Sequence, residues 1–238
     1  MSPKAEPRTK SRLPLSRERV LDAAIRLADE GGIESVTMRK LARELGVEAM
    51  SLYNHVQNKS DLVNGIVDLV FAEVELPETG EWDDAVRQCA ISAHEAFLRH
   101  PWACSLMLSP TMTPGVRAPR LLYMEWLLRR LREAGFSPDL TYHAYHALDS
   151  HILGFTLWQL AHSVAADSIR GERDLADFAA DFLRRLPAAD YPNFAEHVQQ
   201  HLVAPAGDGA REFEFGLDLI LEGLDRARAG PGPSGAAA

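Results

Sequence analysis

The chain has 238 residues, which is enough to bury a sizeable core in one or two domains. Apolar residues make up 46% and charged residues 25%, as in an ordinary globular protein, and no apolar run approaches the roughly 18 residues of a membrane span. The N-terminal stretch MSPKAEPRTKSR lacks the apolar core of a secretion signal, so we expect a cytoplasmic protein.

The formal net charge of −9 argues against a nucleic-acid partner, but its distribution argues for one. Residues 1–65 hold 11 Lys and Arg against 9 Asp and Glu, whereas the rest of the chain holds 14 against 25. Because salt screens charges beyond about 8 Å, a slightly basic module on an acidic body can still bind phosphates. Residues 1–15, rich in proline and basic side chains, are expected to be a disordered arm that lies along DNA or only aids solubility.

The first predicted helix begins after Ser16, a good N-cap, and ends at Gly31-Gly32. Its apolar residues recur at helical spacing and form one core stripe: Val20, Ala23, Ala24, Leu27 and Ala28.

Two short helices with a tight turn are predicted next, over residues 37–56. Thr37 caps the first, which ends at Leu45, and Gly46 provides the left-handed residue that terminates it. The second runs from residue 48 or 49 to about Val56. This spacing is typical of a helix-turn-helix, whose second helix enters the DNA major groove.

The second helix has an unusual outward face. Leu52 and Val56, spaced i, i+4, should face inward. The outward residues are small, polar or aromatic: Ala49, Met50, Ser51, Tyr53, Asn54 and His55. Such side chains suit contacts with phosphates and base edges, although a merely polar helix face is the alternative. Asn58 is expected to cap a further helix over residues 59–74, with Asp61 near its positive end.

From residue 81 onward the pattern is helical throughout, which predicts an all-α fold. The expected helices cover residues 82–100, 120–134, 138–166, 174–186, 194–202 and 212–229. A short apolar turn is expected at 102–108, loops at 109–119 and 205–210, and a disordered tail at 230–238. We therefore divide the chain into a helix-turn-helix domain, 16–76, and a helical domain, 77–229.

The last helix is apolar on more than one face. Phe213, Leu217, Ile220, Leu221 and Leu224 form one stripe, and Phe215 and Leu219 widen it. The long helix from Pro138 is similar, so the two helices suit a four-helix bundle with a second copy of the chain. An ordinary buried pair within one subunit is the alternative.

Residues 17–76 resemble the DNA-binding domain of the TetR family of bacterial transcriptional repressors. The stretches that carry the resemblance are VLDAAIRLADEGGIESVTMRKLARELGV, SLYNHV and NKSDLV. The resemblance implies phosphate contacts for Thr37, Tyr53 and Lys59. It implies base contacts for Arg39, Ala49, Met50, Ser51, Asn54 and His55. The later stretches GFSPDL and FEFGLDLILEGL resemble the dimer-forming helices of the tetracycline repressor group.

The same resemblance places a small-molecule pocket in the helical domain. Two positions that are polar in the tetracycline repressor are Leu127 and Trp158 here, so tetracycline itself is not expected. The candidate walls suit a bulky apolar or aromatic ligand: Trp102, Leu106, Met107, Trp126, Leu127, Phe155 and Trp158. An aromatic core with no cavity is the alternative.

Other chemistry is weakly indicated. His143, His146 and Asp149 share a helix face, but no convergent ligands accompany them, so we expect no metal and no cofactor. Cys89 and Cys104 are expected to be buried thiols. No Gly-rich phosphate loop, nucleophile elbow or HExxH motif is present.

We therefore expect a dimeric repressor, not an enzyme, that a small apolar or aromatic molecule releases from a palindromic operator. The alternatives are a ligand-independent nucleoid-type DNA-binding protein and an enzyme with an incidental helix-turn-helix.

Overall fold

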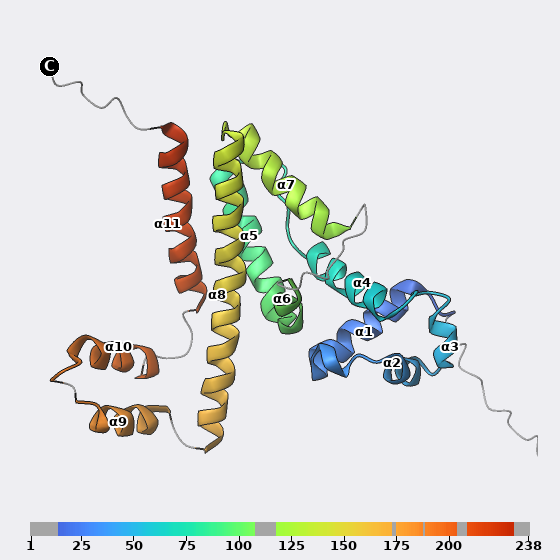
Figure 1. Ribbon diagram of the computed structural model, residues 1–238, viewed down its shortest axis with the longest axis horizontal. Helices are drawn as coiled ribbons and strands as arrows, with labels where there is room; N and C mark the ends of the chain where they lie inside the picture. The colour runs from blue at the N-terminus through green and yellow to red at the C-terminus, as the bar shows by residue number, and fades with distance from the viewer. Residues whose placement is uncertain (1–13, 108–117, 173–174, 188, 204–208, 231–238) are drawn as a thin grey trace, which may run out of the picture. The chain divides into compact units, whose positions relative to one another are not determined.

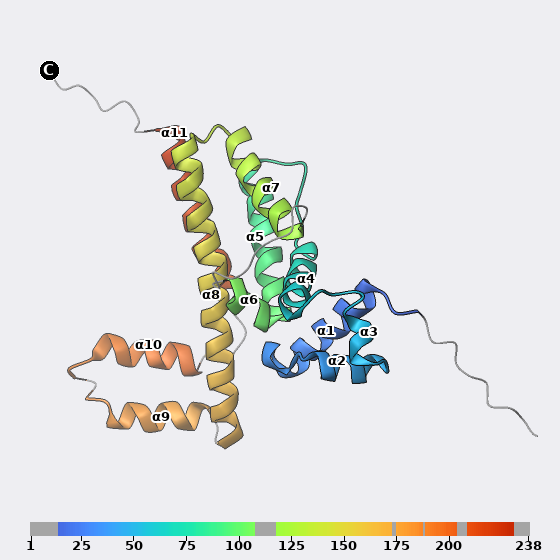
Figure 2. The same ribbon diagram turned by 45° about the vertical axis from the view of Figure 1, so that its right-hand side comes forward.

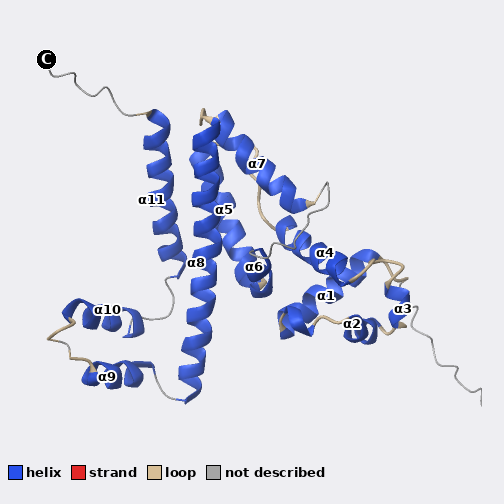
Figure 3. Ribbon diagram, in the orientation of Figure 1, coloured by secondary structure: helices blue, strands red, loops and turns tan. Residues whose placement is uncertain are grey.

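The computed structural model describes residues 14–107, 118–172, 175–187, 189–203 and 209–230 (Figure 1). In these ranges the regular elements are helices, which confirms the all-α prediction (Figure 3). The predicted basic arm up to residue 13, most of the two predicted loops and the tail from residue 231 lie outside the described ranges. The chain divides into two compact units, residues 1–67 and 68–238, so the boundary falls inside the helix α4.

The first unit begins with α1, Arg17–Gly31. The Ser16 side chain accepts the backbone N–H of Arg19, as expected of an N-cap, and Gly32 ends the helix with φ of 72°. All five residues of the predicted stripe are buried, with Val20, Ala23 and Ala24 at 0% exposure. A short 3-10 turn, η1 (Ile33–Ser35), leads to the next helix.

The helix-turn-helix is present, with one correction. Helix α2 covers Met38–Leu45; Thr37 accepts the N–H of Lys40, and Gly46 adopts the left-handed conformation with φ of 65°. The second helix, α3 (Ala49–Leu52), ends four residues before the predicted Val56. The backbone after it tightens into i→i+3 hydrogen bonds, from Tyr53 N to Met50 O at 3.3 Å and from Asn54 N to Ser51 O at 3.4 Å.

Helix α4, Lys59–Ala72, starts as predicted. The side chain of Asn58 accepts the N–H of Asp61 at 2.9 Å, which satisfies one of the free amides of the first turn. Leu62, Ile66 and Val67 are fully buried.

The second unit is organised around one long helix. Helix α8, Pro138–Glu172, packs against α5 (Trp82–Arg99), α6 (Pro101–Met107), α7 (Pro119–Glu133) and α11 (Gly209–Ala229). Figures 1 and 2 show α11 and α5 running alongside α8. Ser137 caps α8 by accepting the N–H of Leu140 at 3.2 Å, as the Ser-Pro-Asp signal predicts.

Three predicted boundaries in this unit are wrong. Residues 101–107 form helix α6 where a turn was predicted, because Pro101 suits the first helical position and no glycine interrupts the segment. Helix α8 continues past the predicted Ala166 to Glu172, since no glycine or proline occurs between Ala166 and Gly171. Helix α11 begins at Gly209, three residues before the predicted Glu212.

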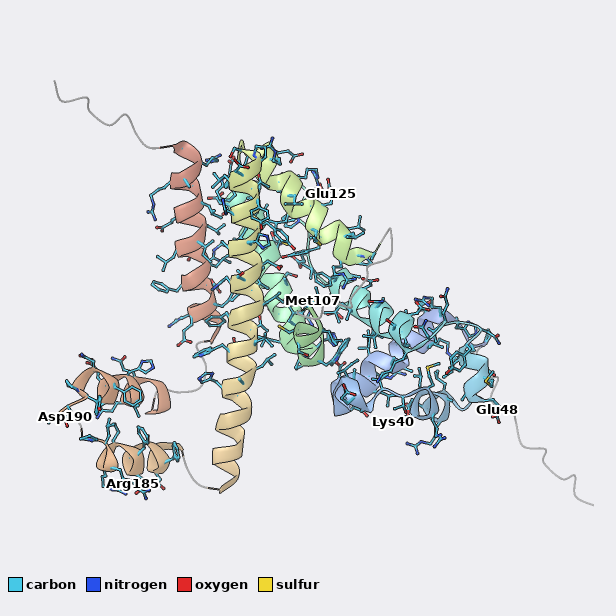
Figure 4. All side chains as sticks on the ribbon, viewed as in Figure 1. Lys40, Glu48, Met107, Glu125, Arg185 and Asp190 are labelled. Carbon is cyan, nitrogen blue, oxygen red and sulfur yellow. The ribbon has the colours of Figure 1, made fainter. Side chains whose placement is uncertain are left out.

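The remaining helices are α9, Leu175–Arg185, and α10, Pro192–Val203, which pack on each other as a hairpin. Figure 4 labels Arg185 and Asp190 on either side of the connection between them. In the described part of the chain, every helix is too short or too polar to span a bilayer.

Candidate nucleic-acid interface and ligand pocket

The helix α3 and the turn after it divide cleanly into an inner and an outer side. Leu52 and Val56 have 0% and 1% exposure, so both face inward as predicted. Between them, Tyr53 is 46% exposed and Asn54 is exposed, and Met50 earlier in the helix is 75% exposed. Ala49, Ser51 and His55 are partly exposed. All six predicted outward residues are therefore at least partly accessible to solvent. We name residues 49–55 the recognition segment.

A second surface of this unit is basic. Thr37, Arg39, Lys40 and Arg43 line a hollow of about 300 Å³ along α2. Thr37 and Arg39 were predicted from the resemblance, but Lys40 and Arg43 were missed. The signal was available, because positions 37, 40 and 43 are spaced by three residues and share a helix face. Figure 4 labels Lys40 on α2 and Glu48 just before α3.

Arg17 connects three parts of this unit. Its Nη1 donates to the carbonyl oxygen of His55 at 2.9 Å, and its guanidinium forms a bidentate pair with Asp61. The hydrogen bond from Arg17 is the largest of the effects that hold the pKa of Asp61 below its ordinary value. Lys59, the predicted phosphate contact, is exposed in the first turn of α4, two residues before Asp61.

The predicted pocket residues of the second unit fall into two groups. Trp102, Trp126 and Leu127 are at most 6% exposed, and the indole N–H of Trp126 donates to the carbonyl of Pro77 at 3.2 Å. Phe155 and Trp158 lie together on α8 with ring centroids 5.5 Å apart, and Trp158 is 40% exposed. Leu106 and Met107, at the end of α6, are partly exposed.

A buried histidine, His94, was not predicted from the sequence, and its ring lies 5.9 Å from that of Phe155. His94 on α5 is 3% exposed, stacks on Phe213 of α11 at 4.0 Å, and its Nδ1 lies 2.7 Å from the Thr156 hydroxyl. That hydroxyl donates to the carbonyl of Ile152, so it accepts from His94, which places a proton on Nδ1. Burial, and then the nearby charge of His151, lower the pKa of His94 to about 4, so the ring is neutral at pH 7. The sequence signal was its position one turn after Ala90 in the buried stripe of α5.

Asp149 is a partly buried carboxylate on α8. Burial raises the pKa of its carboxyl above the ordinary value, against a smaller lowering by His146. Burial is the larger cause that raises the pKa of Tyr145 on α8 and the pKa of Cys104 on α6. The negative charge of Asp149 is the second cause in both cases. His143 and His146 are exposed. Among the described residues, no group of three or more His, Cys, Asp or Glu side chains is placed to hold a metal ion.

Both cysteines are buried free thiols, as predicted. Burial raises the pKa of Cys89 to about 12 and is the larger cause that raises that of Cys104 to about 11, so neither is a reactive thiolate at neutral pH.

Helix α11 has two distinct apolar faces. Phe213, Leu217, Leu221 and Leu224 are buried against the rest of the unit. Phe215 and Leu219, the residues that widen the stripe, are 67% and 54% exposed. Because these two residues are one turn apart, they form an apolar face on the solvent side of α11.

Comparison with known proteins agrees with both units. Residues 20–66 match the family model described as bacterial regulatory proteins, tetR family. Residues 76–228 match the model described as tetracyclin repressor-like, C-terminal domain.

Individual relatives span nearly the whole chain. An HTH-type transcriptional regulator of Saccharopolyspora erythraea is 31% identical over 227 residues, which are 93% of this chain and 89% of the relative. The tetracycline repressor protein class D of Escherichia coli is 32% identical over 218 residues, 89% of each chain. The structure of ActR from Streptomyces coelicolor in complex with actinorhodin has a TM-score of 0.68 at 28% identity and covers 92% of this chain and 100% of its own.

These relatives are transcriptional regulators, and the similarity covers both the first and the second unit of this chain. The exposed recognition segment, the basic hollow beside it and the helical second unit are the parts that such a regulator requires. The chain belongs to the TetR family of DNA-binding transcriptional regulators.

Proposed function

We propose that the protein is a homodimeric repressor that binds a palindromic operator and leaves it when a small apolar or aromatic molecule binds the second unit. The observation that supports this most directly is the recognition segment. Met50 and Tyr53 stay in solvent although Leu52, between them, is fully buried. The inner side of the segment is therefore packed against the unit, and its outer side remains open to DNA.

The contacts that we propose divide by chemistry. Thr37, Tyr53 and Lys59 bind phosphates, which position the unit on the duplex. The side chains that face base edges are Arg39, Ala49, Met50, Ser51, Asn54 and His55. Among them, Arg39 suits guanine and Asn54 suits adenine, because each can form a bidentate pair with that base.

The dimer follows from α11 and α8. Phe215 and Leu219 on α11, together with the 61% exposed Tyr142 on α8, would be covered by the same helices of a second copy. Two copies would place their recognition segments about 34–36 Å apart, one turn of DNA.

The ligand would lie among the pocket residues of α6, α7 and α8. Aromatic side chains supply most of the walls, and the fully buried Thr156 lies next to Phe155 on α8. The related protein ActR from Streptomyces coelicolor forms a complex with the small molecule actinorhodin. To reverse operator occupancy fully, the ligand must favour the DNA-incompetent state by about 5.5 kcal/mol.

The test begins with the full-length protein and promoter fragments from its own genome. We expect retention of a small set of fragments that share a palindrome. Actinorhodin and a panel of aromatic compounds are then screened by thermal shift, and each compound that stabilises the protein is tested for release of the retained fragment. Uniform binding to all fragments would instead support a nucleoid-type protein. Compounds that stabilise the protein but do not release the fragment would contradict the proposal that a ligand induces release.

A further inference from the structure

Arg17, the carbonyl of His55 and the carboxylate of Asp61 form what we name the Arg17 clasp. Arg17 Nη1 donates to His55 O at 2.9 Å and to Asp61 Oδ2 at 3.0 Å, and Nη2 donates to Asp61 Oδ1 at 2.7 Å. The planar guanidinium matches a carboxylate in this fork geometry, which adds direction as well as attraction. One side chain at the start of α1 therefore fixes the end of the recognition segment and the first turn of α4.

Asp61 is itself held in place. Its Oδ2 also accepts the backbone N–H of Gln57 at 2.8 Å, and its own N–H donates to the side chain of Asn58 at 2.9 Å. The carboxylate lies in the first turn of α4, where the helix dipole favours a negative charge. The Asp61 carboxylate is therefore fixed by the first turn of α4, and Arg17, which binds it, holds the His55 carbonyl in a fixed position.

The recognition segment needs such a support. Helix α3 has only four residues, and the backbone after it is joined by i→i+3 bonds of 3.3 Å at Tyr53 and 3.4 Å at Asn54. Bonds of this length and type define a backbone direction weakly. Leu52 and Val56 fix the inner side, and the backbone amides of His55 and Val56 donate to the Leu52 carbonyl at 2.9 and 3.0 Å. The His55 carbonyl is held from outside the segment, by the Arg17 hydrogen bond from 38 positions earlier in the chain.

We propose that Arg17 and Asp61 are positioning residues for DNA recognition: the clasp holds the turn that carries Tyr53, Asn54 and His55 in its reading orientation and does not itself contact DNA. This inference rests on the proposed DNA contacts. It also gives a role to a carboxylate on a surface that faces phosphates, where a negative charge opposes binding through space.

The direction in which one substitution changes operator affinity distinguishes a positioning role from a simple charge effect. Asp61→Asn removes a negative charge from the DNA-binding unit, so charge alone predicts tighter binding to every duplex. The clasp predicts the opposite for the operator, because the neutral amide no longer forms the charged fork with Arg17. We expect a loss of about five- to tenfold in operator affinity, the size of an ordinary hydrogen bond, because the Arg17 and Asp61 side chains are 46% and 27% exposed.

The experiment measures the affinity of the full-length protein for a retained promoter fragment and for a scrambled duplex across a salt series. Asp61→Asn and Arg17→Gln should each lower operator affinity relative to scrambled-duplex affinity, leave the salt slope nearly unchanged, and combine without further loss in that ratio. Asp61→Glu, which keeps a carboxylate within reach of Arg17, should recover part of the loss.

Three outcomes would overturn the inference. Unchanged or tighter operator binding by Asp61→Asn would leave only the charge effect. A salt slope reduced by about 0.9 in Arg17→Gln would make Arg17 a direct phosphate contact. Equal losses on operator and scrambled duplex, with a lowered unfolding midpoint, would make the clasp a stability feature only. If the wild-type protein retains no fragment, the proposed function itself fails, which is distinct from all three.

Discussion

Single side chains decide how the first unit meets DNA, and Lys59 offers the simplest test. Its ammonium is exposed at the start of α4 and would add one phosphate contact per protomer. Each contact that releases a condensed counterion contributes about 0.9 to the slope of log affinity against log salt. We expect Lys59→Ala to lower affinity for all duplexes and to reduce that slope by about 0.9 per protomer. Arg226→Ala, an exposed charge on α11, is the control and should leave the slope unchanged.

His94 makes a prediction about pH and stability. Its pKa is about 4 in the folded protein, against an ordinary 6.5, so between these values the unfolded chain binds the proton more strongly. The neutral ring therefore makes its full contribution to the free energy of unfolding above pH 6.5. This contribution, up to about 3 kcal/mol, is lost as pH falls towards 4. Urea unfolding at several pH values should show a steeper acid loss in the wild type than in His94→Gln. Parallel curves for the two proteins would contradict the buried neutral ring.

At the scale of elements, capping residues in the sequence predict the starts of α1, α2, α4 and α8, but not those of α6 and α11. Ser16, Thr37, Asn58 and Ser137 all act as the predicted caps, because a cap depends only on residues within one turn. The end of α3 was not predictable in this way. Its terminal turn is held by Arg17, which lies 38 positions from His55, and no local pattern reports such a contact. The buried role of His94 depends likewise on Thr156 and Phe213, on two other helices.

The turn between α2 and α3 depends on Gly46, whose φ of 65° disfavours a side chain. Gly46→Ala should destabilise the protein by about 1 kcal/mol and weaken operator binding, because the angle between the two helices is set there. Gly46→Asn, which tolerates this conformation better, should lose less. Denaturant unfolding of both variants is the measurement, and equal stability of Gly46→Ala and wild type would show that the turn is not strained by a side chain.

At the scale of the whole molecule, the proposed function depends on a dimer that presents two DNA-binding first units to one operator. Apolar composition alone indicated that α11 has more apolar surface than one core needs, and the structure separates its buried face from the exposed Phe215 and Leu219. The proposed ligand site is less predictable from sequence. Its candidate walls are mostly aromatic, but whether they enclose a ligand or fill a core is decided by packing among several helices.

The dimer surface can be broken without touching the core of one subunit. Phe215→Glu with Leu219→Glu places two charges on the exposed face of α11, where a second copy would have to bury them without partners. We expect monomers by sedimentation equilibrium, unchanged helicity and a loss of operator affinity of at least about 100-fold. Glu125→Lys on α7, also an exposed charge change, should remain dimeric. A double variant that still sediments as a dimer would place the interface elsewhere.

The stoichiometry of the DNA complex tests the central claim most directly. Sedimentation of the wild-type protein with a retained promoter fragment should give two protomers per palindrome. A duplex that carries one half-site should bind far more weakly, since only one recognition segment can engage. A single protomer bound to the full site, with the same affinity for the half-site, would contradict the account.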